Sequence, residues 1–237
     1  MTTPTPSFVL LPPGGQRILF VLAHPDDAEF LCGGTVARLT EEGREVHYLL
    51  VTPGDKGSDD PEMTPERLAP IREDEQRNAA RVLGVQSVIF LGYHDGEVEV
   101  TIPLRRELVY HIRKIRPDVT FTFDPWKPNE IHPDHRAVGM CTLDALACAR
   151  GRMYFPEQLQ EGLSAHRANQ IYFFSTDRPN HWVDITPVIE KKLAGLACHA
   201  SQMINFDADE YIRRKARQAG VEHRFKYAEA LHHYVMG

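Results

Sequence analysis

Residues 17–27 read Arg-Ile-Leu-Phe-Val-Leu-Ala-His-Pro-Asp-Asp, an apolar run that ends in side chains able to bind a metal. The run 17–23 is rich in branched residues and does not alternate with polar ones, which predicts a strand buried on both faces of a parallel sheet. The polar residues 24–27 follow at once, so they lie at the carboxyl end of this strand. Pro25 favours the first turn of a helix directly after it.

A second stretch nearly repeats the first. Residues 132–135 (His-Pro-Asp-His) come shortly after the apolar run 119–123, as residues 24–27 (His-Pro-Asp-Asp) follow the run 17–23. Each stretch offers a histidine and, three residues later, a second group that binds metals. Imidazoles and carboxylates in this mixture are the ligands of catalytic zinc ions.

Strands and helices alternate along the rest of the chain. Further strands are expected at residues 45–51, 87–91, 119–123 and 170–175, and helices at 33–42, 72–83, 103–116, 134–149, 187–200 and 207–218. The Gly-, Asp- and Pro-rich segment 52–63 is expected to be a loop. The alternation predicts an α/β protein, a Rossmann-like three-layer sandwich with a mostly parallel sheet. We expect a single domain over residues 1–237, with a loose arm at 1–15.

The expected fold brings the two polar stretches together. In the common doubly wound strand order, the first and fourth strands are neighbours at the switch point, where such sheets bind ligands. His24 follows the first strand, and His132 and His135 come after the fourth. The fold therefore predicts one site built from both stretches.

Three of these side chains suit a metal ion. Catalytic zinc usually has three protein ligands and one open position. His24 and Asp27 are three residues apart and project to the same side of a helix start, and His135 can supply the third ligand. Two imidazoles and one carboxylate also fit non-haem iron. Zinc is therefore the expected cofactor, and iron or another divalent metal stays open.

The side chains left over suit hydrolysis. A metal-bound water has its pKa lowered from about 15.7 to about 7. Asp26 is expected to accept the proton of that water as general base, and His132 to face the developing oxyanion. Asp134 is expected either to hold the imidazole of His132 or to brace a metal ligand.

Composition narrows the class of protein. Apolar residues make up 42% of the chain and charged residues 25%, with a net charge of −6 and no basic stripe, which argues against a nucleic-acid partner. No run approaches the roughly 18 apolar residues that a membrane span needs. Four cysteines without a C-x-x-C pair suit a reducing compartment. We therefore expect a cytoplasmic protein without a membrane span.

The motifs resemble those of the PIG-L/LmbE-like N-acetylglucosaminyl deacetylases, over roughly residues 17 to 231. The two His-Pro-Asp stretches carry the resemblance most specifically. Weaker matches lie at 32–35, 71–73, 75, 79–80, 83–84, 95–96, 199, 201–202 and 227–229. Two departures are Ala28, which separates the Asp pair from Glu29, and Glu130, where many members of the family carry Asp.

The resemblance implies the same roles for the site residues as their chemistry and spacing do. His24, Asp27 and His135 would bind zinc, Asp26 would be the general base, and His132 would stabilise the oxyanion. Asp134 would tune His132. The implied reaction is hydrolysis of an N-acyl group, usually acetyl, from a small-molecule amino sugar or its conjugate, and this substrate class comes from the resemblance alone.

Four further residues are candidates for substrate contacts. The resemblance places Arg72 near the substrate, although its charged surroundings also fit a solvated helix face. Asp95 precedes a glycine in an expected turn, His199 also fits a satisfied core histidine, and Trp126 offers a flat surface to a sugar ring.

Two other classes of function stay open. A nucleotide-dependent oxidoreductase would share the sheet, but residues 24–27 stand where a G-x-G-x-x-G phosphate loop belongs. A non-catalytic metal- or sugar-binding protein would share the fold, but it has no need of a spare carboxylate such as Asp26. The natural substrate and the formation of a homo-oligomer are not fixed by the sequence.

Overall fold

The computed structural model describes residues 15–204 and 206–237, so the arm expected at 1–15 lies almost wholly outside the described residues. Within that part of the chain, one sheet has the strand order β3-β2-β1-β4-β5-β7-β6. The strands are β1 (Arg17–Leu22), β2 (Glu45–Leu50), β3 (Ser87–Phe90), β4 (Val119–Phe123), β5 (Gln170–Phe174), β6 (His181–Asp184) and β7 (Ala228–Val235). The first five are parallel, and β7 runs antiparallel to both β5 and β6.

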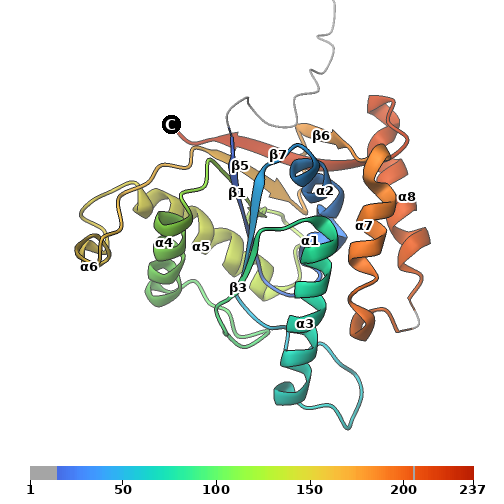
Figure 1. The fold of residues 1–237 in the computed structure, drawn as a ribbon, viewed down its shortest axis with the longest axis horizontal. Coiled ribbons are helices and arrows are strands. Elements are labelled where there is room, and N and C mark those ends of the chain that lie inside the picture. Colours follow the sequence, from blue (N-terminus) through green and yellow to red (C-terminus); the bar gives the residue numbers. More distant parts are fainter. Residues whose placement is uncertain (1–14, 205) are drawn as a thin grey trace, which may run out of the picture.

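Helices cover both faces of the sheet (Figure 1). They are α1 (Asp27–Leu31), α2 (Gly33–Glu41), α3 (Pro65–Leu83), α4 (Ile102–Ile115), α5 (Pro133–Ala149), α6 (Pro156–Gln160), α7 (Ile189–Leu196) and α8 (Ala208–Gly220). The pair α4 and α5 packs on one face, whereas α2, α3, α7 and α8 pack on one another over the other face. The predicted three-layer α/β sandwich with a mostly parallel sheet is confirmed. None of the helices in the described part of the chain combines the length and apolar character needed to cross a bilayer.

Aromatic side chains fix the register of the central strands. Phe20 of β1 stacks on Phe121 of β4 with ring centroids 4.4 Å apart, and Phe121 stacks on Tyr172 of β5 at 4.9 Å. These residues are also direct partners in the strand pairing. Cross-strand aromatic pairs stabilise a single register. Because β1 and β4 are paired in this register, the segments that follow them begin at the same edge of the sheet.

The structure differs from the sequence prediction in helix α3, in the short helix α6, which was not predicted, and in two strands. Helix α3 begins at Pro65 rather than at residue 72, because Thr64 is extended and a proline is well suited to the first helical turn. Pro70 lies inside this first part, and a proline there indicates the end of a helix rather than its interior. Strands β6 and β7 were not predicted, since their burial depends on each other and on β5 rather than on a local apolar run.

Candidate metal and catalytic site

The histidines of the two polar stretches meet at the carboxyl ends of β1 and β4. One ring nitrogen each of His24, His132 and His135 lies within 4.8 Å of the other two. The rings of His24 and His132 have centroids 4.4 Å apart, and those of His24 and His135 are 5.3 Å apart. Side chains separated by more than a hundred positions in the chain therefore form one cluster.

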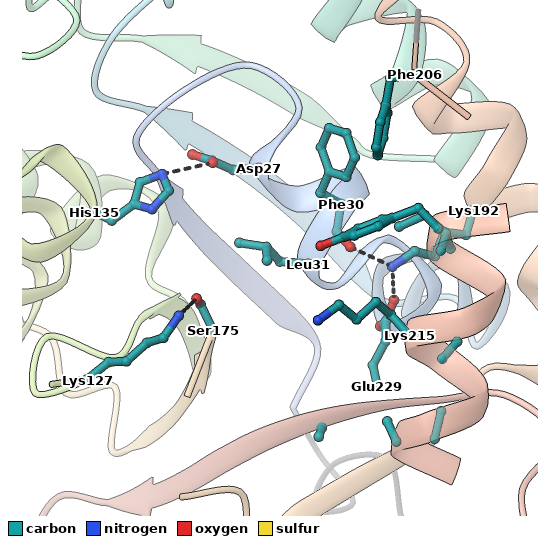
Figure 2. Close-up of a pocket in the computed structure, with 16 residues that line it drawn as sticks. Asp27, Phe30, Leu31, Lys127, His135, Ser175, Lys192, Phe206, Lys215 and Glu229 are labelled. Carbon is teal, nitrogen blue, oxygen red and sulfur yellow. Dashed lines mark hydrogen bonds and ion pairs between the residues drawn. The ribbon is translucent and has the colours of Figure 1, made fainter. Parts of the chain in front are cut away.

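The carboxylate of Asp27 lies between two of these rings. Its Oδ2 accepts the backbone N–H groups of Ala23 and His24, at 3.0 and 2.7 Å. The same oxygen is 3.7 Å from His24 Nδ1, and Oδ1 is 3.2 Å from His135 Nε2 (Figure 2). The backbone just after β1 thus holds the Asp27 carboxylate in place, with an imidazole nitrogen on each side of it.

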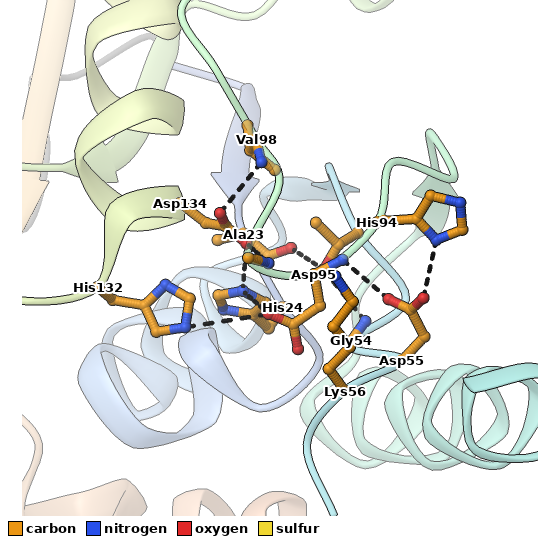
Figure 3. Close-up of polar contacts among 12 residues, drawn as sticks. Ala23, His24, Gly54, Asp55, Lys56, His94, Asp95, Val98, His132 and Asp134 are labelled. Carbon is orange, nitrogen blue, oxygen red and sulfur yellow. Dashed lines mark hydrogen bonds and ion pairs between the residues drawn. The ribbon is translucent and has the colours of Figure 1, made fainter. Parts of the chain in front are cut away.

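A pair of carboxylates braces the far nitrogen of His24. Its Nε2 is 3.0 Å from Asp134 Oδ2 and 3.2 Å from Asp95 Oδ1 (Figure 3). Asp134 also accepts the N–H groups of Gly96 and Val98, at 2.7 and 3.2 Å. Because carboxylates accept, Nε2 carries a hydrogen, and Nδ1 is the nitrogen left to bind a ligand once it has lost its proton. Of the two roles expected for Asp134, the geometry favours bracing of a metal ligand.

His135 is held in the same way. Its Nδ1 is 3.3 Å from Glu130 Oε1, which leaves Nε2 directed at Asp27. Metal-binding histidines in proteins commonly have a carboxylate on the nitrogen that does not bind the metal. Two braced imidazoles and the carboxylate between them are therefore chemically suited to a divalent cation.

Electrostatics of the cluster favour positive charge at the imidazoles of His24 and His135. Burial lowers the pKa of His24, but the carboxylates of Asp134, Asp27 and Asp95 outweigh it and raise the pKa to about 12. Burial raises the pKa of Asp27, and the neighbouring His135 and His24 bring it well below its usual range. A cation that binds His24 must displace a proton, so metal binding and protonation compete.

Asp26 has an unusual backbone that the surrounding residues hold. It lies in the left-handed region with φ 90° and ψ −21°, which is strained for a residue other than glycine. Its N–H donates to Gln76 Oε1 at 3.0 Å, and Gln76 Nε2 donates to both carboxylate oxygens of Glu29 at 3.2 Å. Glu29 is fully buried and also contacts His199 Nε2 at 3.2 Å. The buried row His199–Glu29–Gln76 therefore fixes the position of Asp26.

Sequence reasoning assigned no role to Gln76 and left that of Glu29 open. One signal was available for Gln76, because it stands four residues after Arg72 on α3 and thus shares its face. The contacts of Gln76 with Asp26 and Glu29 could not be predicted from sequence spacing, because they depend on how α3 packs beside α1.

Arg72 is a buried partner of Asp26. Its Nη2 is 3.2 Å from Asp26 Oδ2 and donates to Pro25 O at 2.7 Å, while Nη1 donates to Gly54 O at 2.9 Å. Arg72 is 4% exposed, so the solvated-face alternative is wrong. Burial raises the pKa of Asp26 and Arg72 lowers it, with a net rise to about 7. A Cβ at Gly54, where φ is +69°, would lie 2.4 Å from Arg72 Nη1, so the loop needs a glycine here.

His132 and Asp95 lie on the same side of the cluster. His132 Nε2 is 4.0 Å from Asp95 Oδ1, and in the described part of the chain its Nδ1 is buried without a hydrogen-bond partner. Burial lowers the pKa of His132, and the charges of His24 and His135 lower it further. Asp95 is held by its own N–H, which donates to Asp55 Oδ1 at 2.8 Å (Figure 3).

A cavity of about 650 Å³ opens beside the cluster, with Asp27 and His135 in its wall (Figure 2). Its other walls come from α1, α7, α8, β7 and the segments after β4 and β5. None of the four predicted substrate contacts is among the lining residues. His199 is fully buried against Glu29, and Trp126 packs edge-on against Phe173. The structure thus brings Arg72 and Asp95 to the cluster but places His199 and Trp126 elsewhere.

Fold and site together define an α/β protein that presents a braced His/Asp cluster beside a partly buried carboxylate on a strained backbone. The chain belongs to the PIG-L family, described as GlcNAc-PI de-N-acetylase, which matches residues 19–146. The resemblance inferred from the motifs is confirmed.

Individual relatives support this assignment. The chain is 36% identical over 222 residues to a diacetylchitobiose deacetylase of Thermococcus kodakarensis, which covers 91% of this chain and 82% of that protein. The solved structure of the N,N'-diacetylchitobiose deacetylase from Pyrococcus horikoshii superposes with a TM-score of 0.90 at 32% identity, covering 94% and 85% of the two chains. GalB, a 4-carboxy-2-hydroxymuconate hydratase from Pseudomonas putida, shares the fold at a TM-score of 0.80 and 24% identity over 94% of this chain and 97% of its own. The fold alone therefore does not decide the reaction.

Proposed function

We propose that this chain is a metal-dependent N-deacetylase that hydrolyses the amide of an N-acylated amino sugar or its conjugate. The observation that carries the proposal is the position of Asp26, whose carboxylate is fixed by Arg72 and whose N–H is fixed by Gln76, next to the ligand Asp27. A protein that only binds a metal has no use for this strained second carboxylate. The names of the relatives supply the substrate class.

His24, Asp27 and His135 would hold the metal, and zinc is the ion that we propose. A zinc ion at such a site lowers the pKa of water from about 15.7 to about 7 and polarises a carbonyl group. The same donor set suits iron, so the two metals are to be compared directly.

The protein's own groups would then move protons and orient the amide. Asp26 accepts a proton from the attacking water and delivers it to the leaving nitrogen. His132 faces the oxyanion, and Asp134 keeps His24 in the tautomer that binds through Nδ1. Asp95, whose Oδ1 is 4.0 Å from His132 Nε2, would contact the sugar.

The size of the cavity supports a small-molecule substrate, because a volume of about 650 Å³ is in the range of small-molecule sites. The cysteines support the proposed location. All four cysteines are free thiols, as suits a reducing, cytoplasmic location.

The direct test is amine release from N-acetylglucosamine and N,N'-diacetylchitobiose by protein loaded with zinc or with iron. We expect release with at least one metal and none after chelation, with activity restored when the metal is added back. Absence of release from every N-acyl amino sugar in a broad panel, by protein whose metal content is confirmed, would overturn the proposed function.

His132→Ala is expected to lower kcat by about 10²–10³, the usual effect of removing one oxyanion donor. Metal content should stay at the wild-type level, because His24, Asp27 and His135 remain. Steady-state kinetics with metal analysis of the same sample checks both statements. An unchanged kcat would remove His132 from the mechanism.

Gln76→Met is expected to lower kcat roughly 10- to 100-fold, the range seen when a residue that orients a metal site is lost. The substitution keeps the length of the side chain but removes the acceptor for Asp26 N–H and the donor to Glu29. The matched control is Gln158→Met on α6, where a buried amide likewise bridges Arg113 and a backbone carbonyl. Both variants should lose stability, and only Gln76→Met should lose kcat; equal kcat values would contradict a positioning role.

A further inference from the structure

We infer that the cavity beside Asp27 and His135 binds an apolar group of the substrate, either an N-acyl chain longer than acetyl or an apolar aglycone. The inference rests on the proposed function, because it assigns the cavity to the substrate of that site. Figure 2 shows the cavity extending from these two residues toward the C-terminal helices.

The walls of the cavity are largely hydrocarbon. The lining includes Phe30 and Leu31 of α1, Ile212 and Ala219 of α8, and Phe206. The Phe206 ring is 6.1 Å from Phe30 and 5.3 Å from Tyr211, so aromatic rings link the two walls. Walls of this kind favour apolar ligands, because the burial of apolar surface supplies most of the favourable free energy of binding there.

Among the charged groups in the walls, Lys192, Glu229 and Lys127 are paired with protein atoms. Lys215, in the described part of the chain, has no ion pair or hydrogen bond and lies 5.8 Å from the centroid of the Tyr211 ring. Lys192 Nζ is 2.6 Å from Glu229 Oε1, and Lys127 Nζ is 3.2 Å from Glu130 Oε2. Glu229 also accepts the N–H of Gly34 at the start of α2, at 2.9 Å. A sugar with several hydroxyls would have to compete for these groups, whereas an apolar chain leaves every pair intact.

Two substrate series distinguish the two sources of the apolar group. One lengthens the acyl chain of glucosamine from acetyl through butanoyl and hexanoyl to octanoyl, and the other compares methyl and octyl glycosides of N-acetylglucosamine. We expect kcat/KM to rise by about fourfold per methylene buried in one of the series. The series that rises identifies the group, and flat values in both series would overturn the inference.

Calorimetric titration with N-octanoylglucosamine separates the inference from the proposed function. Binding that tightens with chain length but gives no turnover of any compound would overturn the proposed function alone. Turnover that is independent of chain length would overturn only the inference that an apolar group of the substrate occupies the cavity. Absence of both turnover and binding would overturn both.

A substitution in α8 tests whether the apolar group of the substrate lies in this cavity. Ala219→Phe adds a ring to the cavity wall, so the ratio of kcat/KM for octanoyl to acetyl substrate is expected to fall toward one. Gln218→Phe is the matched control, because its exposed side chain on the same helix is not part of the wall. An unchanged ratio in Ala219→Phe, or an equal fall in both variants, would place the apolar group elsewhere.

Discussion

Asp26→Asn is expected to lower kcat by about 10²–10⁴, the usual contribution of a general acid–base group, while zinc content stays at the wild-type level. Asparagine has the same shape and still offers an oxygen to Arg72 Nη2, which lies 3.2 Å from the native carboxylate. The amide, however, cannot accept a proton from water at neutral pH. The loss should therefore appear in kcat with little change in KM, as expected for an interaction used in the transition state.

The matched control is Asp118→Asn at the opposite edge of the sheet. Asp118 Oδ2 accepts the N–H groups of Gln16 and Arg17, at 2.7 and 2.9 Å, so this carboxylate also fixes the chain at one end of β1. Its replacement should lower the melting temperature and leave kcat unchanged. Loss of zinc from Asp26→Asn would make Asp26 a ligand, and a wild-type kcat would remove it from the chemistry.

The strand pairing and the meeting of the two motifs were predictable from local sequence. The run 17–23 is apolar at every position but the first, and β1 is buried as such a run requires. The neighbouring position of β4 follows from the common strand order of doubly wound sheets, and the pairing of Ile18 with Val119 confirms it. Both predictions use patterns of a few residues and a general rule of topology.

The residues that orient the site were not predictable in the same way. Gln76 and Glu130 are ordinary polar residues on a charged helix and in a loop, and their roles depend on which atoms lie 3 Å away after the helices have packed. Glu130 was noticed only as a departure from the family pattern, yet its carboxylate contacts His135 Nδ1 at 3.3 Å. Likewise, His199 resembled a substrate contact by its motif, whereas the structure places it behind Glu29. Spacing along the chain shows which side chains share an element, and packing decides their partners.

His135→Ala is expected to weaken zinc binding by more than 100-fold and to abolish turnover at ordinary zinc concentrations. Loss of a residue that only orients a ligand costs about 10- to 100-fold in metal affinity, and removal of the ligand itself should exceed that. Glu130→Gln, which keeps His135 but weakens the contact with its Nδ1, should therefore fall between His135→Ala and the wild type.

Competition with a chromophoric chelator gives these affinities without any activity measurement. The matched control is His47→Ala in β2, where the half-buried imidazole contacts Ser87 Oγ at 2.8 Å and lies outside the cluster. It should bind zinc as the wild type does. Wild-type affinity in His135→Ala would exclude this histidine as a ligand and leave His24 with His132, the other ring of the cluster, as the pair to be tested. The graded order His135→Ala, Glu130→Gln, wild type is expected only if the metal binds the nitrogen that Glu130 leaves free, because a histidine that packs without binding metal would make the two variants equal.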